Sequence, residues 1–381
     1  MKNRPNLFLA VAMLLCLLCA GPLAAAPAAT PPAVAGTGHL LLDMGSNQVL
    51  AAQNIDQRLE PASLTKILTA YVVFREIDNG HISLTDPVLV SEKAWRMEGS
   101  RMFIEVGKQV SVEDLLKGLI VASGNDSAVA LAEHTAGSEE AFANLMNEHA
   151  QRLGMTNSHF VNASGLPHPD HYTTPADITR ATIATIREFP EWYAWYADKE
   201  YTYNDITQPN RNRLLWRDES VDGVKTGHTS TAGYCLVASA QRDDMRLISV
   251  VMGTDSEEER AIETQKLLGY GFRFFENQRL YDAGQTVQQV RVWKGESETL
   301  PVGVAESLSL TVPRGETGST EARLVLHGTI EAPVGKGQEV GVIEVTNGGE
   351  IVRRVPAVAL AGVGEAGFLG QMMDSVLMMF E

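Results

Sequence analysis

The alternation of apolar and polar residues predicts a strand hairpin near the start of the chain and helices after it. Apolar runs at residues 39–43 and 48–52 flank the turn residues Gly45-Ser46-Asn47, as expected for two paired strands. Helical patterns then dominate from Glu60 to Phe189. The first of these helices begins near Pro61, which is tolerated there because its missing N–H group has no helical partner to lose.

Strand-like sequence returns after the helices. Residues 232–241 and 245–254 are β-rich and are joined by Arg242-Asp243-Asp244, which predicts a second hairpin. Residues 261–277 are predicted to be helical. Because strands lie at both ends and helices between them, we expect an α/β (α+β) domain over residues 37–280, with one antiparallel sheet covered by helices.

The pattern changes again from Gly284. Short alternating segments separated by glycine-containing turns predict a small all-β domain over residues 284–361; these segments are 287–292, 308–312, 322–326 and 339–345. This region has no cluster of histidines, cysteines or paired carboxylates, so no chemistry is assigned to it.

The C-terminal segment 364–381 is predicted to form an amphipathic helix. Its apolar residues recur at three- and four-residue spacing, from Phe368 to Phe380, with Gln371 and Asp374 on the opposite side. We interpret it as a membrane-anchor helix that lies on a lipid surface. A helix packed on its own domain is the alternative, because the polar side carries acids and lacks the lysines and arginines usual in interfacial helices.

The N-terminal segment 1–26 has the features of a secretory signal peptide. Lys2 and Arg4 precede an apolar run over residues 7–20, and small residues follow it. An uncleaved anchor is the alternative, but the run is shorter than the ~20 residues that span a bilayer. Residues 27–36 are rich in proline and alanine and are predicted to be a linker. The mature protein is therefore expected to be exported.

Composition then narrows the range of functions. The chain has 381 residues, 44% hydrophobic and 20% charged, which is ordinary for a globular protein and enough for about two domains. The formal net charge of −16 argues against nucleic-acid binding, because such a chain repels phosphate backbones. Loss of the signal peptide would leave Cys235 as the only cysteine, so no internal disulfide is expected.

The first candidate motif for chemistry is Ser63-Leu64-Thr65-Lys66. Ser63 and Lys66 are one helical turn apart, so both side chains project from the same face. The following residues 67–74 are apolar on nearly all sides, which predicts a buried helix. Burial lowers the pKa of a lysine and makes Lys66 a candidate general base beside a candidate nucleophile. On its own, a serine three positions before a lysine is a common pair.

Two further motifs follow in order. Ser123-Gly124-Asn125 forms a polar break between two apolar helical segments, where buried polar groups need partners. Lys225-Thr226-Gly227 precedes the second hairpin; its glycine permits close backbone approach, and its lysine and threonine suit an anionic group. The three motifs together, in this order, match a set found in class A β-lactamases and penicillin-binding proteins.

The sequence resembles the low-molecular-weight penicillin-binding proteins of the penicillin-binding-protein-5 type, which act as D-alanyl-D-alanine carboxypeptidases. The resemblance runs from the signal peptide to the final helix. It includes the three motifs and the segments 61–66, 123–126, 210–216, 222–229 and 267–275. It implies a β-lactamase/DD-peptidase-like transpeptidase fold, with a C-terminal β-domain and an amphipathic tail.

The resemblance also implies roles for the motif residues. Ser63 would attack the carbonyl between the two terminal D-alanines of a peptidoglycan stem peptide and form an acyl-enzyme, with Lys66 accepting its proton. Ser123 and Lys225 would relay a proton to the leaving D-alanine, and Asn125 would hold the peptide amide. β-Lactam antibiotics would act as covalent inhibitors by acylating Ser63.

The resemblance places the remaining site residues around the substrate's carboxylate and oxyanion. The N–H groups of Ser63 and His228 would form the oxyanion hole, next to Gly227. Thr226 and Arg260 would bind the terminal carboxylate; for Arg260, a surface charge among acids is the alternative. No cofactor and no metal are expected. The implied location is the bacterial periplasm, at the outer face of the inner membrane.

The sequence departs from the family pattern at two places, and several alternative functions remain. Ser164 stands where a histidine is expected in the best-known member, and the acidic tail lacks a basic face. A class A β-lactamase shares the motifs but needs a Glu with an Asn four residues later, placed to activate the deacylating water. The stretch about 35 residues after Ser123 offers no such pair, and the pair Glu200 and Asn204 lies too late in the chain. A DD-endopeptidase is a further alternative, as is a non-catalytic cell-wall-binding protein. A metallohydrolase would depend on His168-Pro-Asp-His171, which has no evident further ligand.

Overall fold

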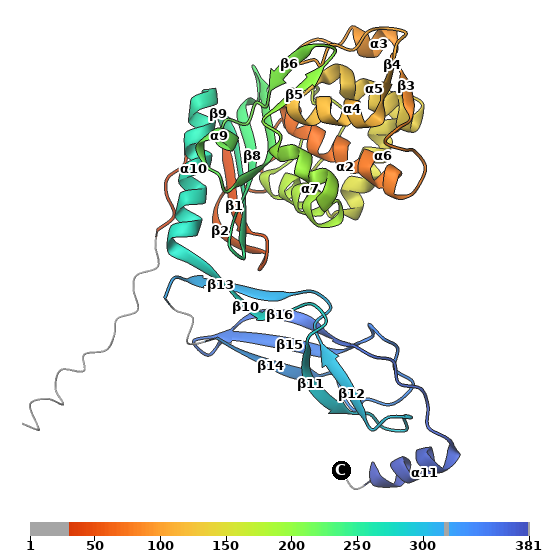
Figure 1. Cartoon of the computed structure of the whole chain (residues 1–381). Helices are drawn as coiled ribbons and strands as arrows, with labels where there is room; N and C mark the ends of the chain where they lie inside the picture. The colour runs from red at the N-terminus through yellow and green to blue at the C-terminus, as the bar shows by residue number, and fades with distance from the viewer. Residues whose placement is uncertain (1–29, 316–319, 380–381) are drawn as a thin grey trace, which may run out of the picture. The chain divides into compact units, whose positions relative to one another are not determined.

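The computed structural model describes residues 30–315 and 320–379 (Figure 1). The expected signal peptide, residues 1–26, lies outside the described residues. Residues 27–29 of the expected linker also lie outside them.

The central element is a five-stranded antiparallel sheet with the strand order β2-β1-β9-β8-β7. Its strands are β1 (Gly38–Asp43), β2 (Gln48–Gln53), β7 (Val221–Thr229), β8 (Gly233–Arg242) and β9 (Met245–Thr254). The chain therefore leaves the sheet after β2 and rejoins it at β7, and the expected hairpins 39–52 and 232–254 are both present. The structure has the expected antiparallel sheet covered by helices.

Helices cover both faces of this sheet (Figure 1). All six residues of β1 are buried. Successive residues of a strand point to opposite faces. Leu40 and Leu42 belong to the core beneath the helical cluster, whereas Leu41 lies close to Gly271 of α10 (Glu257–Phe274). This two-sided burial explains why β1 is apolar at nearly every position instead of alternating.

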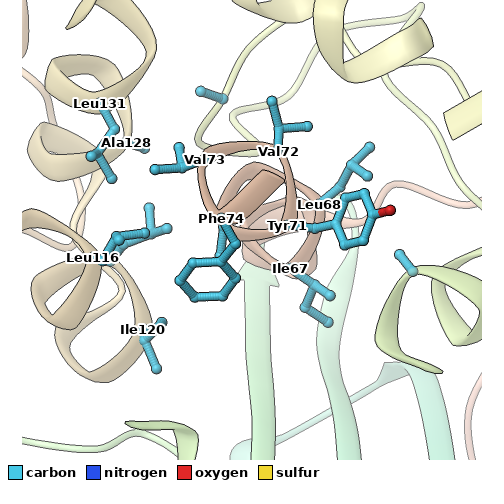
Figure 2. Packing of buried hydrophobic residues seen from close by; sticks show 14 of the residues in the cluster. Ile67, Leu68, Tyr71, Val72, Val73, Phe74, Leu116, Ile120, Ala128 and Leu131 are labelled. Carbon is cyan, nitrogen blue, oxygen red and sulfur yellow. The ribbon is translucent and has the colours of Figure 1, made fainter. Parts of the chain in front are cut away.

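The helical cluster surrounds α2 (Thr65–Asp78), whose first ten residues are all buried. Figure 2 shows side chains of α2 packed against those of neighbouring segments, including Leu116 and Leu131. The surrounding elements are α4 (Val112–Lys117), the π-helical turn η3 (Gly118–Ala122), α5 (Asn125–Ala136), α6 (Glu139–Arg152) and α7 (Pro175–Glu188). A helix that is apolar on all sides is stable only in such a position.

Short elements complete this part of the chain. Within the region of helical sequence, β3 (Pro87–Leu89) pairs with β4 (Gln109–Ser111). After that region, β5 (Glu200–Tyr203) pairs with β6 (Ile206–Pro209). The short helices are η2 (Ala62–Leu64), α3 (Glu92–Trp95), α8 (Pro190–Tyr193), η4 (Ala194–Ala197) and α9 (Leu214–Arg217). The helix expected at 261–277 is α10, which ends at Phe274, so the last three expected positions are wrong.

The region after α10 is all-β, as expected. β10 (Phe275–Tyr281) pairs with β13 (Leu308–Pro313). A second antiparallel sheet has the order β11-β12-β16-β15-β14; its strands are β11 (Thr286–Arg291), β12 (Thr299–Gly303), β14 (Thr320–Leu326), β15 (Glu339–Asn347) and β16 (Glu350–Ala359). These sheets enclose a separate apolar core that includes Leu300, Val302 and Ile343.

Helix α11 (Phe368–Leu377) ends the described chain, where the sequence predicts an amphipathic helix. Its apolar residues are exposed, for example Phe368 at 80% and Leu369 at 75%. On the polar side, the carboxylate of Asp374 accepts a hydrogen bond from the backbone N–H of Lys294 at 2.5 Å. No helix in the part of the chain that the structure describes is long and apolar enough to cross a bilayer.

Candidate active site

The three motifs meet at one cleft of about 490 Å³. Residues from each of them line it, together with residues from several other segments. The lining includes Ser63, Ser123, Asn125, Arg211, Thr226 and Arg260. The second motif follows the first by 60 residues, and the third follows the second by 102. The three are brought together because α2 packs against both α5 and β7.

Ser63 lies in the short 3-10 turn η2, directly before α2, and is half-buried at the cleft. Two glycines allow other segments to approach this turn closely. A Cβ atom on Gly227 of β7 would lie 2.9 Å from the carbonyl oxygen of Pro61 and 3.3 Å from the Ser63 nitrogen. A Cβ atom on Gly165 would collide with the backbone of Ala62. Glycine is therefore required at both positions for β7 and the loop that contains Gly165 to border Ser63.

Lys66 is 1% exposed, yet its ammonium group has three acceptors. Nζ donates to Ser63 Oγ at 3.0 Å, to Asn125 Oδ1 at 2.7 Å and to the carbonyl oxygen of Ser164 at 2.7 Å. Burial lowers the pKa of Lys66 to about 7, against a smaller raising effect from the charge of Asp126. A lysine with such a pKa is substantially neutral near pH 7, so it can accept a proton from the adjacent hydroxyl.

The second motif forms the junction between η3 and α5. Ser123 has a left-handed backbone, with φ of +61°, and only 2% of its surface is exposed. This conformation is uncommon for a residue other than glycine and turns the chain sharply before α5 begins. Asn125, the first residue of α5, donates through Nδ2 to the carbonyl oxygen of Glu98 at 2.5 Å. Its oxygen is thereby directed at Lys66.

The third motif precedes the hairpin of β8 and β9, as expected, and itself lies in a strand that the sequence pattern did not predict, the edge strand β7. Lys225 is 3% exposed and donates to the carbonyl oxygen of Thr226 at 3.2 Å. Burial holds the pKa of Lys225 well below its usual range, and the charges of Lys66, Arg211 and Arg260 lower it further. The site therefore concentrates positive charge in a place with little water, where an anion is favoured.

Arg260 of α10 reaches the cleft and is 5% exposed. Nη1 donates to the carbonyl oxygen of Gly227 at 3.2 Å, and Nη2 lies 3.3 Å from Glu257. The guanidinium also lies 5.5 Å from the ring centroid of Tyr234, whose ring contacts that of His228 at a tilt of 30°. These contacts place Arg260 beside the end of the third motif and not on the surface; its binding of a carboxylate stays a prediction.

Three groups at or next to the cleft were not predicted from the sequence. Arg211 lines the cleft, and its charge lowers the pKa of both Lys66 and Lys225. Ser164, noted only as a departure, contributes its backbone carbonyl to Lys66. Asp126 is a buried carboxylate one position after Asn125. A backbone acceptor has no signature in sequence, whereas a carboxylate directly after a polar helix start was a visible signal.

The two histidines considered for a metallohydrolase do not form a metal site. Both ring nitrogens of His171 are engaged, because Nε2 bonds to Thr65 Oγ1 at 2.8 Å and Nδ1 accepts from the Val161 N–H at 3.2 Å. His168 is exposed. Among residues 30–315 and 320–379, no group of three or more histidine, cysteine or acidic side chains is arranged to hold a metal ion.

Comparison with known proteins agrees with this geometry. Residues 25–256 match the D-alanyl-D-alanine carboxypeptidase family model, and residues 275–365 match that of the penicillin-binding protein 5 C-terminal domain. The chain is 44% identical to the D-alanyl-D-alanine carboxypeptidase DacC of Escherichia coli over 357 residues, covering 92% of this chain and 89% of the relative.

Solved structures lead to the same family. Penicillin-binding protein 5 of Haemophilus influenzae matches with a TM-score of 0.83 and 41% identity, over 88% of this chain and all of that one. Penicillin-binding protein D2 of Listeria monocytogenes, in its ampicillin-bound form, matches with a TM-score of 0.60 and 28% identity, over 64% of this chain and all of that one. The protein therefore belongs to the D-alanyl-D-alanine carboxypeptidase family of serine peptidases.

Proposed function

We propose that the protein removes the terminal D-alanine from peptidoglycan stem peptides through an acyl-enzyme on Ser63. The observation that carries this proposal is the 3.0 Å hydrogen bond between Lys66 Nζ and Ser63 Oγ, made by a lysine whose pKa burial lowers to about 7. Neutral Lys66 accepts the hydroxyl proton while Ser63 Oγ bonds to the scissile carbonyl carbon.

The developing negative charge on the carbonyl oxygen needs donors next to Ser63. The close approach of Gly227 to the Ser63 nitrogen supports an oxyanion hole made from the N–H groups of Ser63 and His228. The carbon–nitrogen bond then breaks, and a proton passes through Ser123 and Lys225 to the departing amine. Thr226 and Arg260 hold the carboxylate of the leaving D-alanine. Water finally attacks the acyl carbon and restores the Ser63 hydroxyl.

The cleft favours this peptidase over a class A β-lactamase. Among the lining residues that the structure describes, Glu257 is the sole carboxylate, and it pairs with Arg213 and Arg260. Lys66 instead meets the backbone carbonyl of Ser164 on the loop that borders Ser63. No carboxylate of the lining is therefore free to activate a deacylating water.

Acylation of the purified protein by benzylpenicillin, followed by intact-mass spectrometry, tests the proposal. We expect a lasting adduct of one penicillin mass that is absent from the Ser63→Ala variant. Rapid hydrolysis of the antibiotic without an adduct would instead indicate a β-lactamase. If the antibiotic also stayed intact, the protein would be a non-catalytic wall-binding protein.

We also propose that the protein is exported to the periplasm and held at the outer face of the inner membrane by α11. The signal-like residues 1–26 support export, and the exposed apolar residues of α11 support attachment. α11 carries no lysine or arginine, so attachment would depend on burial of apolar surface. N-terminal sequencing of the protein from a bacterial membrane fraction tests export; a sequence beginning at Met1 would contradict it.

A further inference from the structure

Asp126 is a buried carboxylate with an unusual number of backbone donors. It is 1% exposed and lies in the first turn of α5. Oδ1 accepts the N–H of Met102 at 3.0 Å, and Oδ2 accepts the N–H groups of Phe103 at 2.9 Å and Ile104 at 3.3 Å. Oδ1 also accepts the N–H of Ser127 at 2.9 Å. One carboxylate thus holds three consecutive peptide groups of another segment.

That segment is the loop 98–104, which forms part of the cleft wall. Gly99 and Ser100 line the cleft. The carbonyl oxygen of Ser100 accepts the N–H of Asn125 at 2.7 Å, and that of Glu98 accepts Asn125 Nδ2. The loop is therefore attached to the start of α5 at two places: through Asp126 on one side and through Asn125 on the other.

The attachment determines which atom of Asn125 faces Lys66. An amide group has a donor end and an acceptor end, and only the acceptor end can bond to an ammonium group. Because Glu98 takes the donor end, Oδ1 is directed at Lys66 Nζ, which lies 2.7 Å away. A loop free to move away would release the amide to rotate.

From this chain of contacts we propose that Asp126 is a positioning residue for acylation: by fixing the loop 98–104, it fixes Asn125 and keeps Lys66 aligned with Ser63. The inference rests on the proposed function, since it assumes that Lys66 activates Ser63. Asp126 itself is not proposed to contact the substrate.

Asp126 also contributes a charge to the site. The charged groups that shift the pKa of Lys66 are Asp126 from α5 and Arg211 from the segment before α9. Lys66 in turn lowers the pKa of Lys225 on β7. Asp126 alone among them raises the pKa of Lys66. Removal of its charge should therefore lower the pKa of Lys66 and move the ascending limb of the pH–rate profile to lower pH. A loosened fold would expose Lys66 to water and would not lower its pKa.

The test compares the native protein with Asp126→Asn in acylation by a fluorescent penicillin between pH 5 and 9. We expect the plateau rate constant to fall at least tenfold and the midpoint of the ascending limb to move to lower pH. Asparagine keeps the size of the side chain but replaces one acceptor oxygen with a donor, which faces N–H groups. If Asp126→Asn does not fold, Asp126→Glu replaces it; here we expect a lowered plateau and an unchanged midpoint.

Asp177→Asn is the matched control. Asp177 is also a 1% exposed carboxylate in a first helical turn, and it holds a loop through the Asn157 N–H and the Ser158 hydroxyl. For Asp177→Asn we expect a loss of thermal stability, less than a twofold change in the plateau rate constant of acylation, and no shift in the midpoint of the ascending limb. A plateau within twofold of native in the Asp126 variant, or equal effects in both variants, would overturn the inference. Absence of acylation in the native protein would overturn the proposed function instead.

Discussion

Helix α2 buries a lysine among apolar residues, whereas helix α11 exposes apolar residues beside acids. Every residue of α2 from Thr65 to Phe74 is buried, Lys66 included, and no residue of α11 is buried. Each helix thus departs from the usual distribution of polar and apolar side chains, in opposite directions. In α2 the departure lowers the pKa of an amine next to the Ser63 hydroxyl; in α11 it leaves an apolar face exposed.

The largest expected effect comes from replacing the buried lysine. Lys66→Gln should lower the rate constant for acylation by benzylpenicillin about 10³-fold, because a positioned general base contributes roughly 10²–10⁴. Lys108→Gln, at an exposed lysine, is the control and should leave the rate unchanged. Rates within tenfold of native for Lys66→Gln, measured on folded protein, would show that the burial of this lysine serves no catalytic purpose.

The next prediction concerns aromatic residues of the two helices. Phe74 is fully buried among the rings of Phe189, Trp192 and Trp195, whereas Phe368 is 80% exposed. Phe74→Ala should lower the free energy of unfolding by about 3–5 kcal/mol. Phe368→Ala should change it by less than about 0.5 kcal/mol. Denaturant unfolding measures both; a large loss for Phe368→Ala would mean that α11 packs on its own protein.

A third prediction separates attachment by apolar burial from attachment by charge. The double variant Leu369→Ser/Met373→Ser should bind vesicles of zwitterionic lipid at least about tenfold more weakly, since each apolar side chain contributes roughly 1.5–3 kcal/mol when buried. Binding of the native protein should change little between low and high salt. Ser375→Ala, on the polar side, should bind as the native protein does. Strong salt dependence, or binding only to anionic vesicles, would contradict the apolar mechanism.

The smallest expected effect comes from a histidine that packs on α2. Burial lowers the pKa of His149 to about 4, and its ring contacts Tyr71 edge-on. Because its pKa in the folded protein lies below the usual 6.5, stability is complete above pH 6.5 and is lost as pH falls towards 4. His149→Phe should reduce this loss by about 1 kcal/mol between pH 7 and pH 5, or roughly 2–4 °C in Tm.

Thermal unfolding at several pH values measures this effect. His168→Gln, at an exposed histidine, should leave the pH dependence of Tm unchanged. An identical acid slope in native protein and His149→Phe would show that His149 does not sense pH through burial.

The contact between Ser63 and Lys66 was easier to predict from the sequence than the residues that surround these two. Ser63 and Lys66 are three residues apart, and the apolar residues after them indicate burial, so their contact followed from helical geometry. The contribution of Ser164 was not predictable in this way, because it is made by a backbone carbonyl. The resemblance to a known family, not periodicity, brought Arg260 to the site.

The sequence pattern missed the short strands β3 to β6, and also β7, β10, β12 and β16. The strands β3 to β6 have three or four residues each, too few for alternation to be recognised. β7 was missed because residues 225–229 are polar or glycine, although several of them are buried at the cleft. Phe274 and Phe275 suit either a helix or a strand, so the boundary between α10 and β10 was misplaced.

The concentration of positive charge around Lys225 has a consequence for binding. Its pKa is held down by burial and by the charges of Lys66, Arg211 and Arg260. A carboxylate that enters the cleft offsets these charges and favours protonation of Lys225. Binding of the anion then raises the affinity of the lysine for a proton, and protonation raises the affinity of the site for the anion. The two effects have the same free energy, because linked binding equilibria are reciprocal. The enzyme would thus take up protons as it binds an anionic peptide, and its affinity for that peptide would decline as the surroundings become alkaline.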